Sequence, residues 1–434
     1  MRGWRMLAVL LVLLLSASTS FAAGFRLPEA GVKAMGMGFA FTAQADDPSA
    51  IYFNPAGLTQ LEGNNVMLGV TYVKENGGEF TGTTPIQLTP KSETQKDLNF
   101  FIPNMYYTNT SKGGWFAWGV GVFAPFGLGQ EYEDKNTSIF RNQITKIDLQ
   151  AIVVNPTIAF KINEAVSVGF GIDFMYGKAE LERTPVIPGT QINIYNLSLE
   201  GDGTAWGYNF GLLVKATPNL RIGANFRSPF TLEIKEGDVA LRNINSTVSF
   251  VPNPAPPPAS FTAAQVFGGT SFDTKGNATI SMPATAAVGV AYTSGRFTIE
   301  ADADWTFWSS YQSLPIDIRD NKGALLPDSD TPKRWEDVVA FRTGLEYRVT
   351  DPLALRLGFV YDPTPAPAET VGPELPDATR LNYMFGIGYK VGKWTVDFAG
   401  MYIDKQDRTI NNANMNGTWK GDAWLAGLDI GYKF

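Results

Sequence analysis

Hydrophobic and polar residues alternate one by one through most of this chain. Within Trp424–Phe434 every even-numbered residue is apolar, whereas the odd-numbered residues include Asp429 and Lys433. The same period of two runs through Leu353–Tyr361 and Phe297–Trp305. Successive side chains of a β-strand point to opposite faces of the sheet. The pattern therefore predicts strands that have one apolar and one polar face.

We count about fourteen segments of this kind with the usual criteria for strands. Connections after even-numbered segments are short, and those after odd-numbered segments are longer, so the long loops emerge on one side. Bacterial outer-membrane barrels combine an even strand number with short periplasmic turns and long outer loops. The sequence therefore predicts an all-β fold, a fourteen-stranded antiparallel transmembrane β-barrel, rather than a soluble β-sandwich. The predicted strands are Asn65–Val73, Leu98–Asn109, Trp115–Ala124, Ile144–Ile162, Ala165–Leu181, Leu197–Ala216, Leu220–Glu233, Ala278–Tyr292, Arg296–Phe307, Trp335–Val349, Leu353–Asp362, Arg380–Val391, Lys393–Ile403 and Gly421–Phe434.

Such a barrel turns its apolar face to lipid and its polar face to the lumen. Trp115, Trp394, Tyr432 and Phe434 then form an aromatic girdle near the short turns, and Trp305, Trp308 and Trp424 form one near the long loops. The predicted lumen carries charges of both signs, which indicates ion pairs that brace the wall rather than the single-sign ring of a simple ion channel. These inward residues are Arg221, Arg227, Arg342, Arg348, Arg356, Asp173, Glu300, Asp302, Asp304, Glu346, Asp362, Asp397 and Asp429.

The N-terminus has the pattern of a secretory signal peptide. Arg2 and Arg5 precede the apolar run Met6–Leu15, and Ser20-Phe21-Ala22 is a suitable cleavage site. An uncleaved anchor is the alternative, but this run is far shorter than the roughly 20 residues that a spanning helix needs. We therefore expect residues 1–22 to be removed on export and the mature chain to reside in the bacterial outer membrane.

Composition excludes several function classes. Cleavage leaves 33 basic against 42 acidic residues, a net charge of −9, which argues against nucleic acid as a partner. The chain has no cysteine and no histidine, so thiol chemistry, Ser-His-Asp hydrolysis and histidine-based zinc sites are absent. No local motif calls for carboxylate catalysis or for a cofactor. We therefore expect a protein that is not an enzyme.

One stretch before the first strand breaks the alternation. It reads IYFNPAGLTQ, in which Asn54 suits a helix N-cap and Pro55 suits the first helical position. Asp47-Pro48 gives the same signal seven residues earlier. The sequence therefore predicts two short helical turns that are not part of the barrel wall.

This region, from Ala23 to Gly63, resembles the N-terminal plug of the FadL/TodX family of outer-membrane transporters for long-chain fatty acids and hydrophobic hydrocarbons. The similar features are the AGF start, the Ala-Asp-Asp stretch and the motif Asn54-Pro55-Ala56. The resemblance continues in family order through APFGLGQEYED, VVNPTIAFKI, WGYNFGLL, LRIGANFRSP, ADADWTFWSSYQ, LRLGFVYDPTPAP and LPDATRLNYMFGIGYKV.

The resemblance implies a hatch of short helices inside the lumen, residues 23–63, within a barrel formed by residues 64–434. It implies passive uptake, in which outer loops capture a hydrophobic ligand, the lumen binds it, and a kinked third strand releases it sideways. It further assigns gating to Asn54, Pro55 and Ala56, and the lateral opening to Gly119, Gly121 and Pro125. A monomer that contacts outer-membrane lipid is the expected state.

Candidate ligand-binding residues lie in the hatch and near the outer loops: Phe25, Met35, Met37, Phe39, Arg356, Asp362 and Arg408. The Pro-rich loop at 252–258, followed by an apolar turn at Phe261–Phe267, is either a landing site or an irregular loop. The sequence does not distinguish a fatty acid from a hydrocarbon. The alternatives are a water-filled diffusion porin and a surface-binding barrel, and neither needs a hatch.

Overall fold

The structure is a computed structural model that describes residues 24–187, 190–250, 261–322 and 326–434. The predicted signal peptide and the Pro-rich run at 252–258 lie outside the described residues. Across the described ranges, no helix combines the length and the apolar character needed to cross a membrane.

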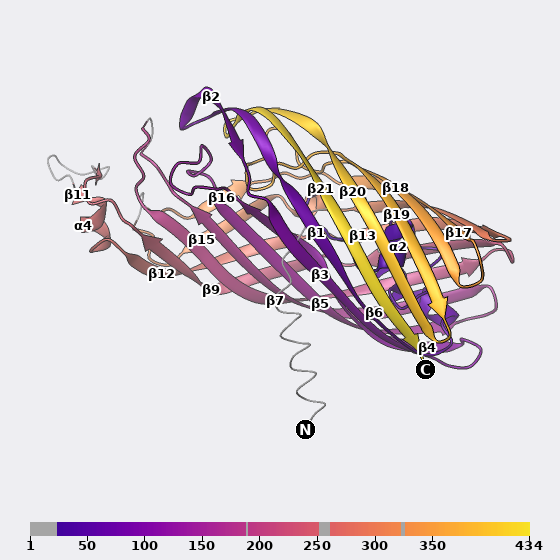
Figure 1. Ribbon diagram of the computed structural model, residues 1–434. Helices are drawn as coiled ribbons and strands as arrows, with labels where there is room; N and C mark the ends of the chain where they lie inside the picture. The colour runs from indigo at the N-terminus through magenta and orange to yellow at the C-terminus, as the bar shows by residue number, and fades with distance from the viewer. Residues whose placement is uncertain (1–23, 188–189, 251–260, 323–325) are drawn as a thin grey trace.

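One antiparallel sheet closes on itself and forms a barrel of 14 strands, as predicted (Figure 1). The first and last strands pair from Asn65–Lys433 to Thr83–Asn416, so the wall has no free end. Closure gives every strand two neighbours, so the backbone N–H and C=O groups of the wall find hydrogen-bond partners that lipid cannot offer. The wall consists of β1 (Gly63–Thr84), β3 (Leu98–Thr110), β4 (Phe116–Glu131), β5 (Lys146–Lys161), β6 (Val166–Arg183), β7 (Asn196–Lys215), β8 (Leu220–Arg227) continued by β9 (Phe230–Arg242), β12 (Phe272–Met282) continued by β13 (Thr285–Ser294), β14 (Phe297–Thr306) continued by β15 (Ser313–Ile318), β16 (Ser329–Pro332) continued by β17 (Val338–Arg348), β18 (Leu353–Asp362), β19 (Arg380–Val391), β20 (Trp394–Asn411) and β21 (Asn416–Lys433).

The remaining elements are short. They are β2 (Gln87–Thr94), the two-stranded pair β10 (Ser249–Phe250) and β11 (Phe261–Thr262), the helices α2 (Val32–Gly36), α3 (Ala50–Phe53) and α4 (Ala263–Phe267), and the 3₁₀ turns η1 (Pro55–Gln60) and η2 (Trp308–Ser310). Thr262 and Gln265 form a capping box at α4, so the apolar turn expected there is a helix.

Two segments that were each predicted to be one continuous strand are each broken into two strands. The segment Leu220–Glu233 is broken between β8 and β9 at Ser228-Pro229, and Ala278–Tyr292 is broken between β12 and β13 at Pro283-Ala284. Proline has no N–H to donate to a sheet, so each proline interrupts the ladder. The outer parts of these strands therefore run separately from their inner parts.

The outer face of the wall is apolar, and the aromatic girdles are mostly confirmed. Trp305 and Trp424 are exposed towards the long loops, and Trp115 and Trp394 are exposed near the short turns. Trp308 was wrongly placed in the girdle. It is 1% exposed because β14 ends at Thr306 and the chain then turns inward through η2.

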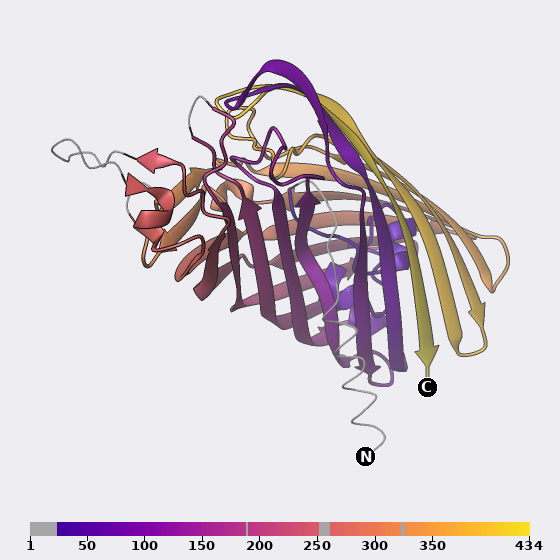
Figure 2. The ribbon, with the colours of Figure 1, turned by 60° about the vertical axis from the view of Figure 1, so that its left-hand side comes forward.

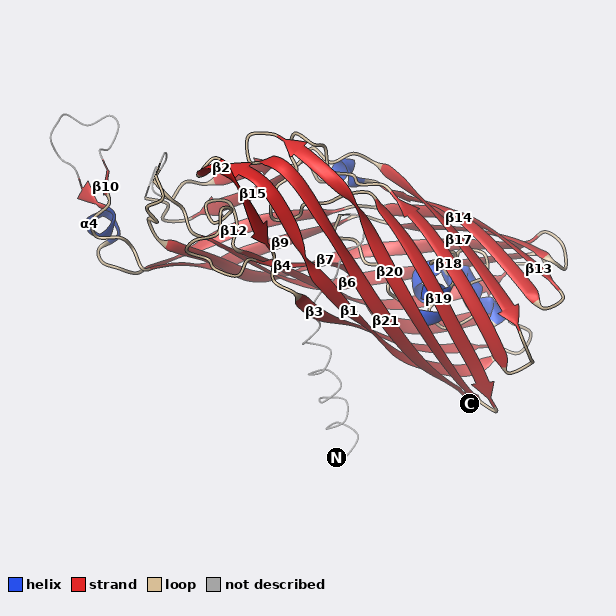
Figure 3. Cartoon of the chain, turned by 45° about the horizontal axis from the view of Figure 1, so that its top comes forward, coloured by secondary structure: helices blue, strands red, loops and turns tan. Residues whose placement is uncertain are grey.

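Residues 24–62, called the plug below, lie inside the barrel. Figures 2 and 3 show the short helices of this segment within the wall, towards the end at which the C-terminus lies, whereas α4 lies at the opposite end. Almost every plug residue is buried, and Leu27, Met35, Phe41 and Ile51 are fully so. The plug therefore fills the periplasmic half of the lumen.

Candidate functional site

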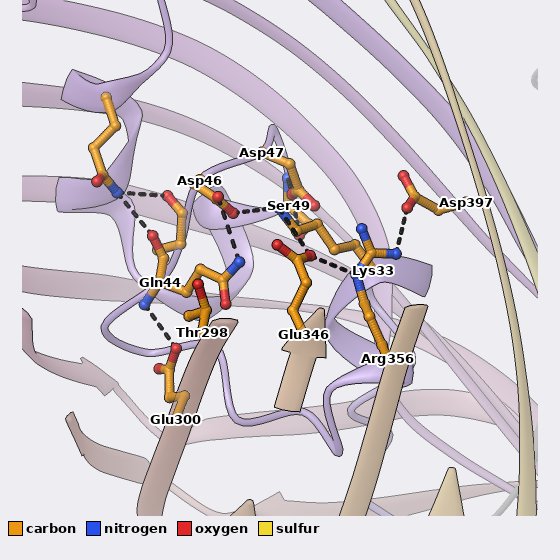
Figure 4. Close-up of polar contacts among 12 residues, drawn as sticks. Lys33, Gln44, Asp46, Asp47, Ser49, Thr298, Glu300, Glu346, Arg356 and Asp397 are labelled. Atoms are coloured by element: carbon orange, nitrogen blue, oxygen red, sulfur yellow. Dashed lines mark hydrogen bonds and ion pairs between the residues drawn. The ribbon is translucent and has the colours of Figure 1, made fainter. Parts of the chain in front are cut away.

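Wall carboxylates hold the plug by its backbone. On β14, Glu300 and Asp302 accept the four successive backbone N–H groups of residues 41–44, at donor–acceptor distances of 2.6 to 3.1 Å. On β21, Asp429 accepts the N–H of Val32 at 2.6 Å. Figure 4 shows the contact of Glu300 with the plug.

Asn54 joins the plug to the wall. Its Nδ2 donates to the carbonyl of Thr42 at 2.7 Å and to that of Leu212 on β7 at 2.9 Å, and its Oδ1 accepts the N–H of Ala56 at 3.2 Å. The predicted N-cap is therefore confirmed, with Pro55 as the first residue of η1. A Cβ at Gly211 would lie 2.2 Å from Asn54 Oδ1, so only glycine leaves room for this contact.

The periplasmic side of the plug is charged. Lys33 pairs with Asp46 at 2.7 Å (Figure 4). Burial opposes ionisation of Asp46, but the charge and hydrogen bond of Lys33, together with Arg221 and Gln44, outweigh burial and lower the pKa of Asp46. Burial raises the pKa of Asp47 to about 6. Below these groups lies an open pocket that Arg221, Glu346 and other charged side chains line.

Above the plug lies an apolar cavity. Phe25 forms its floor, and its ring packs against those of Trp308 and Tyr311 with centroid distances of 4.7 and 5.3 Å. The apolar lining consists of Phe25, Leu128, Ile147, Leu149, Ala179, Leu181, Leu199, Ile234, Val239, Ala278, Ile280, Tyr311, Leu314 and Ile316.

A second cavity continues the first towards the outer loops. The two share Phe25, Leu199 and Tyr311, and the second adds polar side chains. Two of its cations differ in their partners. Lys333 is paired with Glu374. The side chain of Arg183 has no ion pair or hydrogen bond within the described residues, and its Nε is buried without a partner.

The third wall strand is kinked beside the floor of the cavity. Its pairing with β5 shifts between Phe123 and Phe126, and its pairing with β3 ends at Met105–Val122. The N-terminal end of the plug occupies the freed edge instead. Leu27 N–H donates to Pro125 O at 2.8 Å, and Gly127 N–H donates to Phe25 O at 2.9 Å. Residues 25–27 therefore lie where β3 would otherwise pair.

The structure places the predicted residues of this strand and of the hatch as follows. Gly119 and Gly121 face the side chain of Ile51. A Cβ at Gly119 would lie 3.0 Å from that side chain and a Cβ at Gly121 2.9 Å from it, so the two glycines make room for the plug. Met35 and Met37 are fully buried and line neither apolar cavity.

The other ligand-binding candidates are dispersed. Phe39 and Asp362 line a small polar cavity with Glu29, whose pKa burial raises to about 8. Arg356 is held by Glu346 at 2.7 Å and by Asp397. Arg408 donates to the loop carbonyls of Asp377 and Ala366. Of the seven candidates, Phe25 alone lines the two apolar cavities.

Sequence reasoning missed Arg183. The predicted fifth strand ends at Leu181, whereas β6 continues to Arg183. The residue has the same parity as Asp173, which the alternation places inward. Extending the parity rule by two residues would have found it.

Residues 13–434 match the family described as outer membrane protein transport protein (OMPP1/FadL/TodX). The chain belongs to this family. It is an outer-membrane transport protein and not an enzyme. The long-chain fatty acid transport protein of Salmonella typhi is 24% identical and aligns over 96% of both chains. The outer membrane protein P1 of Haemophilus influenzae is 25% identical and aligns over 97% of both.

Solved structures share the fold. A FadL homologue of Pseudomonas aeruginosa has a TM-score of 0.77 at 18% identity, covering 95% of this chain and 100% of that one. The toluene transporter TbuX of Ralstonia pickettii has a TM-score of 0.67 at 20% identity, covering 93% and 98%. Proteins named as transporters of long-chain fatty acids and of toluene therefore both resemble this chain.

Proposed function

We propose that this transporter carries long-chain fatty acids, or amphiphiles with the same anionic head, passively across the outer membrane. The observation that carries the proposal is the unpaired guanidinium of Arg183 at the polar end of a continuous apolar cavity. A guanidinium matches a carboxylate in charge and in its two parallel N–H donors. A hydrocarbon would leave this cation without a partner.

The two cavities suit the two ends of such a ligand. The alkyl chain would lie on Phe25, Leu199 and Ile234, with each buried methylene contributing about 0.8 kcal/mol. The carboxylate would lie at Arg183 in the outer cavity. Lys333 is less suited to the head group because Glu374 already neutralises it.

Release would be lateral, through the wall between β3 and β4. A straight path to the periplasm would lead an alkyl chain through the plug and into the charged cavity of Asp46 and Arg221, which disfavours apolar groups. The unpaired edge of β4 lies beside Phe25 and is covered by residues 25–27. Displacement of these three residues would connect the cavity with the lipid phase.

The test replaces Arg183 with Met and compares the binding of a long-chain fatty acid, its methyl ester and the alkane of equal length. A hydrogen bond to a charged group contributes roughly 1.5–3 kcal/mol, so fatty-acid affinity should fall about 10- to 100-fold. Affinities for the ester and the alkane should stay unchanged. Arg183→Lys should restore part of the loss.

Arg242→Met is the matched control, because Arg242 lies in an exposed ion pair with Asp273 outside the lumen. It should leave all three affinities unchanged. Equal fatty-acid binding by wild type and Arg183→Met would refute the assignment of the head group. Preference of the wild type for the alkane would favour hydrocarbon transport instead.

A further inference from the structure

The wall has a second interruption, between β7 and β9. Strand β7 pairs with β8 from Asn209–Arg227 to Lys215–Arg221. It pairs with β9 from Asn196–Arg242 to Glu200–Asp238. Between these ladders, residues 201–207 have no strand pairing with residues 229–237, all of which the structure describes. We call this interruption the seam.

Side chains rather than a β-ladder close the seam. Four glycines present a flat inner surface there, Gly177 on β6 and Gly201, Gly203 and Gly207 on β7. The side chains of Phe230, Leu232 and Ile234 on β9 cover them. A Cβ at Gly203 would lie 2.3 Å from the carbonyl oxygen of Glu233, so β9 crosses the inner face of β7. The two strands therefore overlap at the seam.

The seam connects the apolar cavity with the level of the outer membrane surface. On its inner side, Gly201, Ile234 and Gly237 line the cavity. On its outer side, Trp206 is 68% exposed at the end nearer the membrane centre, and Glu200 and Asp202 are exposed towards the long loops. Aromatic belts mark the membrane–water interface. The seam therefore lies where the head groups of amphiphiles in the outer leaflet lie.

We infer that the seam is a second lateral opening, through which anionic amphiphiles dissolved in the outer leaflet reach the cavity. The gap beside β4 is occupied by residues 25–27 and needs a movement of the plug. The seam reaches the same cavity above Phe25, and its opening needs no movement of the plug. The two openings thus serve opposite steps, loading at the seam and release at β4. The inference rests on the proposed function.

A disulfide across the seam tests it, since the chain has no cysteine of its own. A Cβ at Gly201 would lie 3.8 Å from that of Ile234, a separation that suits a disulfide. The control pair, Thr395→Cys with Gly431→Cys, has a Cβ separation of 3.7 Å within the intact ladder of β20 and β21. Both pairs are compared oxidised and reduced, by the uptake of labelled fatty acid into cells.

Oxidation of the Gly201→Cys/Ile234→Cys pair should slow uptake at least tenfold, and reduction should restore it. Oxidation of the control pair should have no effect. Leu232→Ala, which removes a covering side chain, should speed uptake. Equal rates for the oxidised and reduced seam pair would overturn the inference. Absence of fatty-acid uptake by every protein, wild type included, would overturn the proposed function as well, and so differs from failure of the seam alone.

Discussion

Asn54→Ala should release the plug from the wall while the barrel stays assembled. The substitution removes the two hydrogen bonds that Nδ2 donates, to Thr42 and to Leu212 on β7, and the cap that Oδ1 gives to Ala56. At roughly 0.5–1.5 kcal/mol for each hydrogen bond, the loss is about 3 kcal/mol. Asn54 is fully buried, so water does not replace these contacts in the docked plug.

A loss of about 3 kcal/mol raises the population of the displaced plug roughly a hundredfold. Hydrogen exchange of the detergent-solubilised protein measures this population directly. The amides of residues 56 and 57 should exchange about a hundredfold faster, whereas those of β19 and β20 should exchange as in the wild type. Fatty-acid uptake should fall, because Phe25 no longer forms a fixed floor.

Two variants sharpen this experiment. Asn54→Asp keeps the acceptor for the Ala56 N–H but places a carboxylate oxygen against the carbonyl oxygens of Thr42 and Leu212, so its effect should be at least as large as that of Asn54→Ala. Asn65→Ala is the control, because Asn65 makes one long contact, of 3.4 Å, at the start of β1. Wild-type exchange at residues 56 and 57 in Asn54→Ala, together with normal uptake, would refute the reasoning.

Two further predictions concern release and pH. Deleting Pro125 removes the extra residue of β4 opposite Ile152 and should straighten the strand. The purified protein should still bind fatty acid, but cells should no longer take it up. Continued uptake would contradict lateral release at β4. Glu29 is buried with a pKa of about 8, above its unfolded value, so its contribution to stability is lost as pH rises. Plug stability should fall by about 1.4 kcal/mol between about pH 7 and about pH 9. Hydrogen exchange corrected for intrinsic rates should show this loss in wild type, and an equal loss in Glu29→Gln would refute it.

The alternation of side chains and the loop lengths predicted the barrel because both are local properties of the chain. Each strand carries its own apolar face, and parity then places residues such as Glu300, Asp302 and Asp429 in the lumen. The girdle prediction for Trp308 followed its position near the long loops rather than parity. The outward residues of β14 are odd-numbered, so the even number of Trp308 already indicates an inward side chain, and Trp308 also lies past the last residue of the strand, Thr306.

The binding site was less predictable because long-range pairing builds it. Only the register shows that residues 25–27 replace β3 along β4, and that β7 and β9 lack pairing at the seam. Charge alone also misled. Arg356 and Arg408 were candidates for binding a ligand head group because of their parity or position. Carboxylates bind Arg356, and loop carbonyls accept hydrogen bonds from Arg408. A partner for each charge can be identified only in three dimensions.

Native mass spectrometry of the protein extracted from outer membranes tests the central claim most directly. Wild type should carry long-chain carboxylates in its lumen, and Arg183→Met should carry much less of them although it is equally folded. Neutral hydrocarbon as the sole bound ligand of the wild type, or equal carboxylate occupancy in both proteins, would contradict the account.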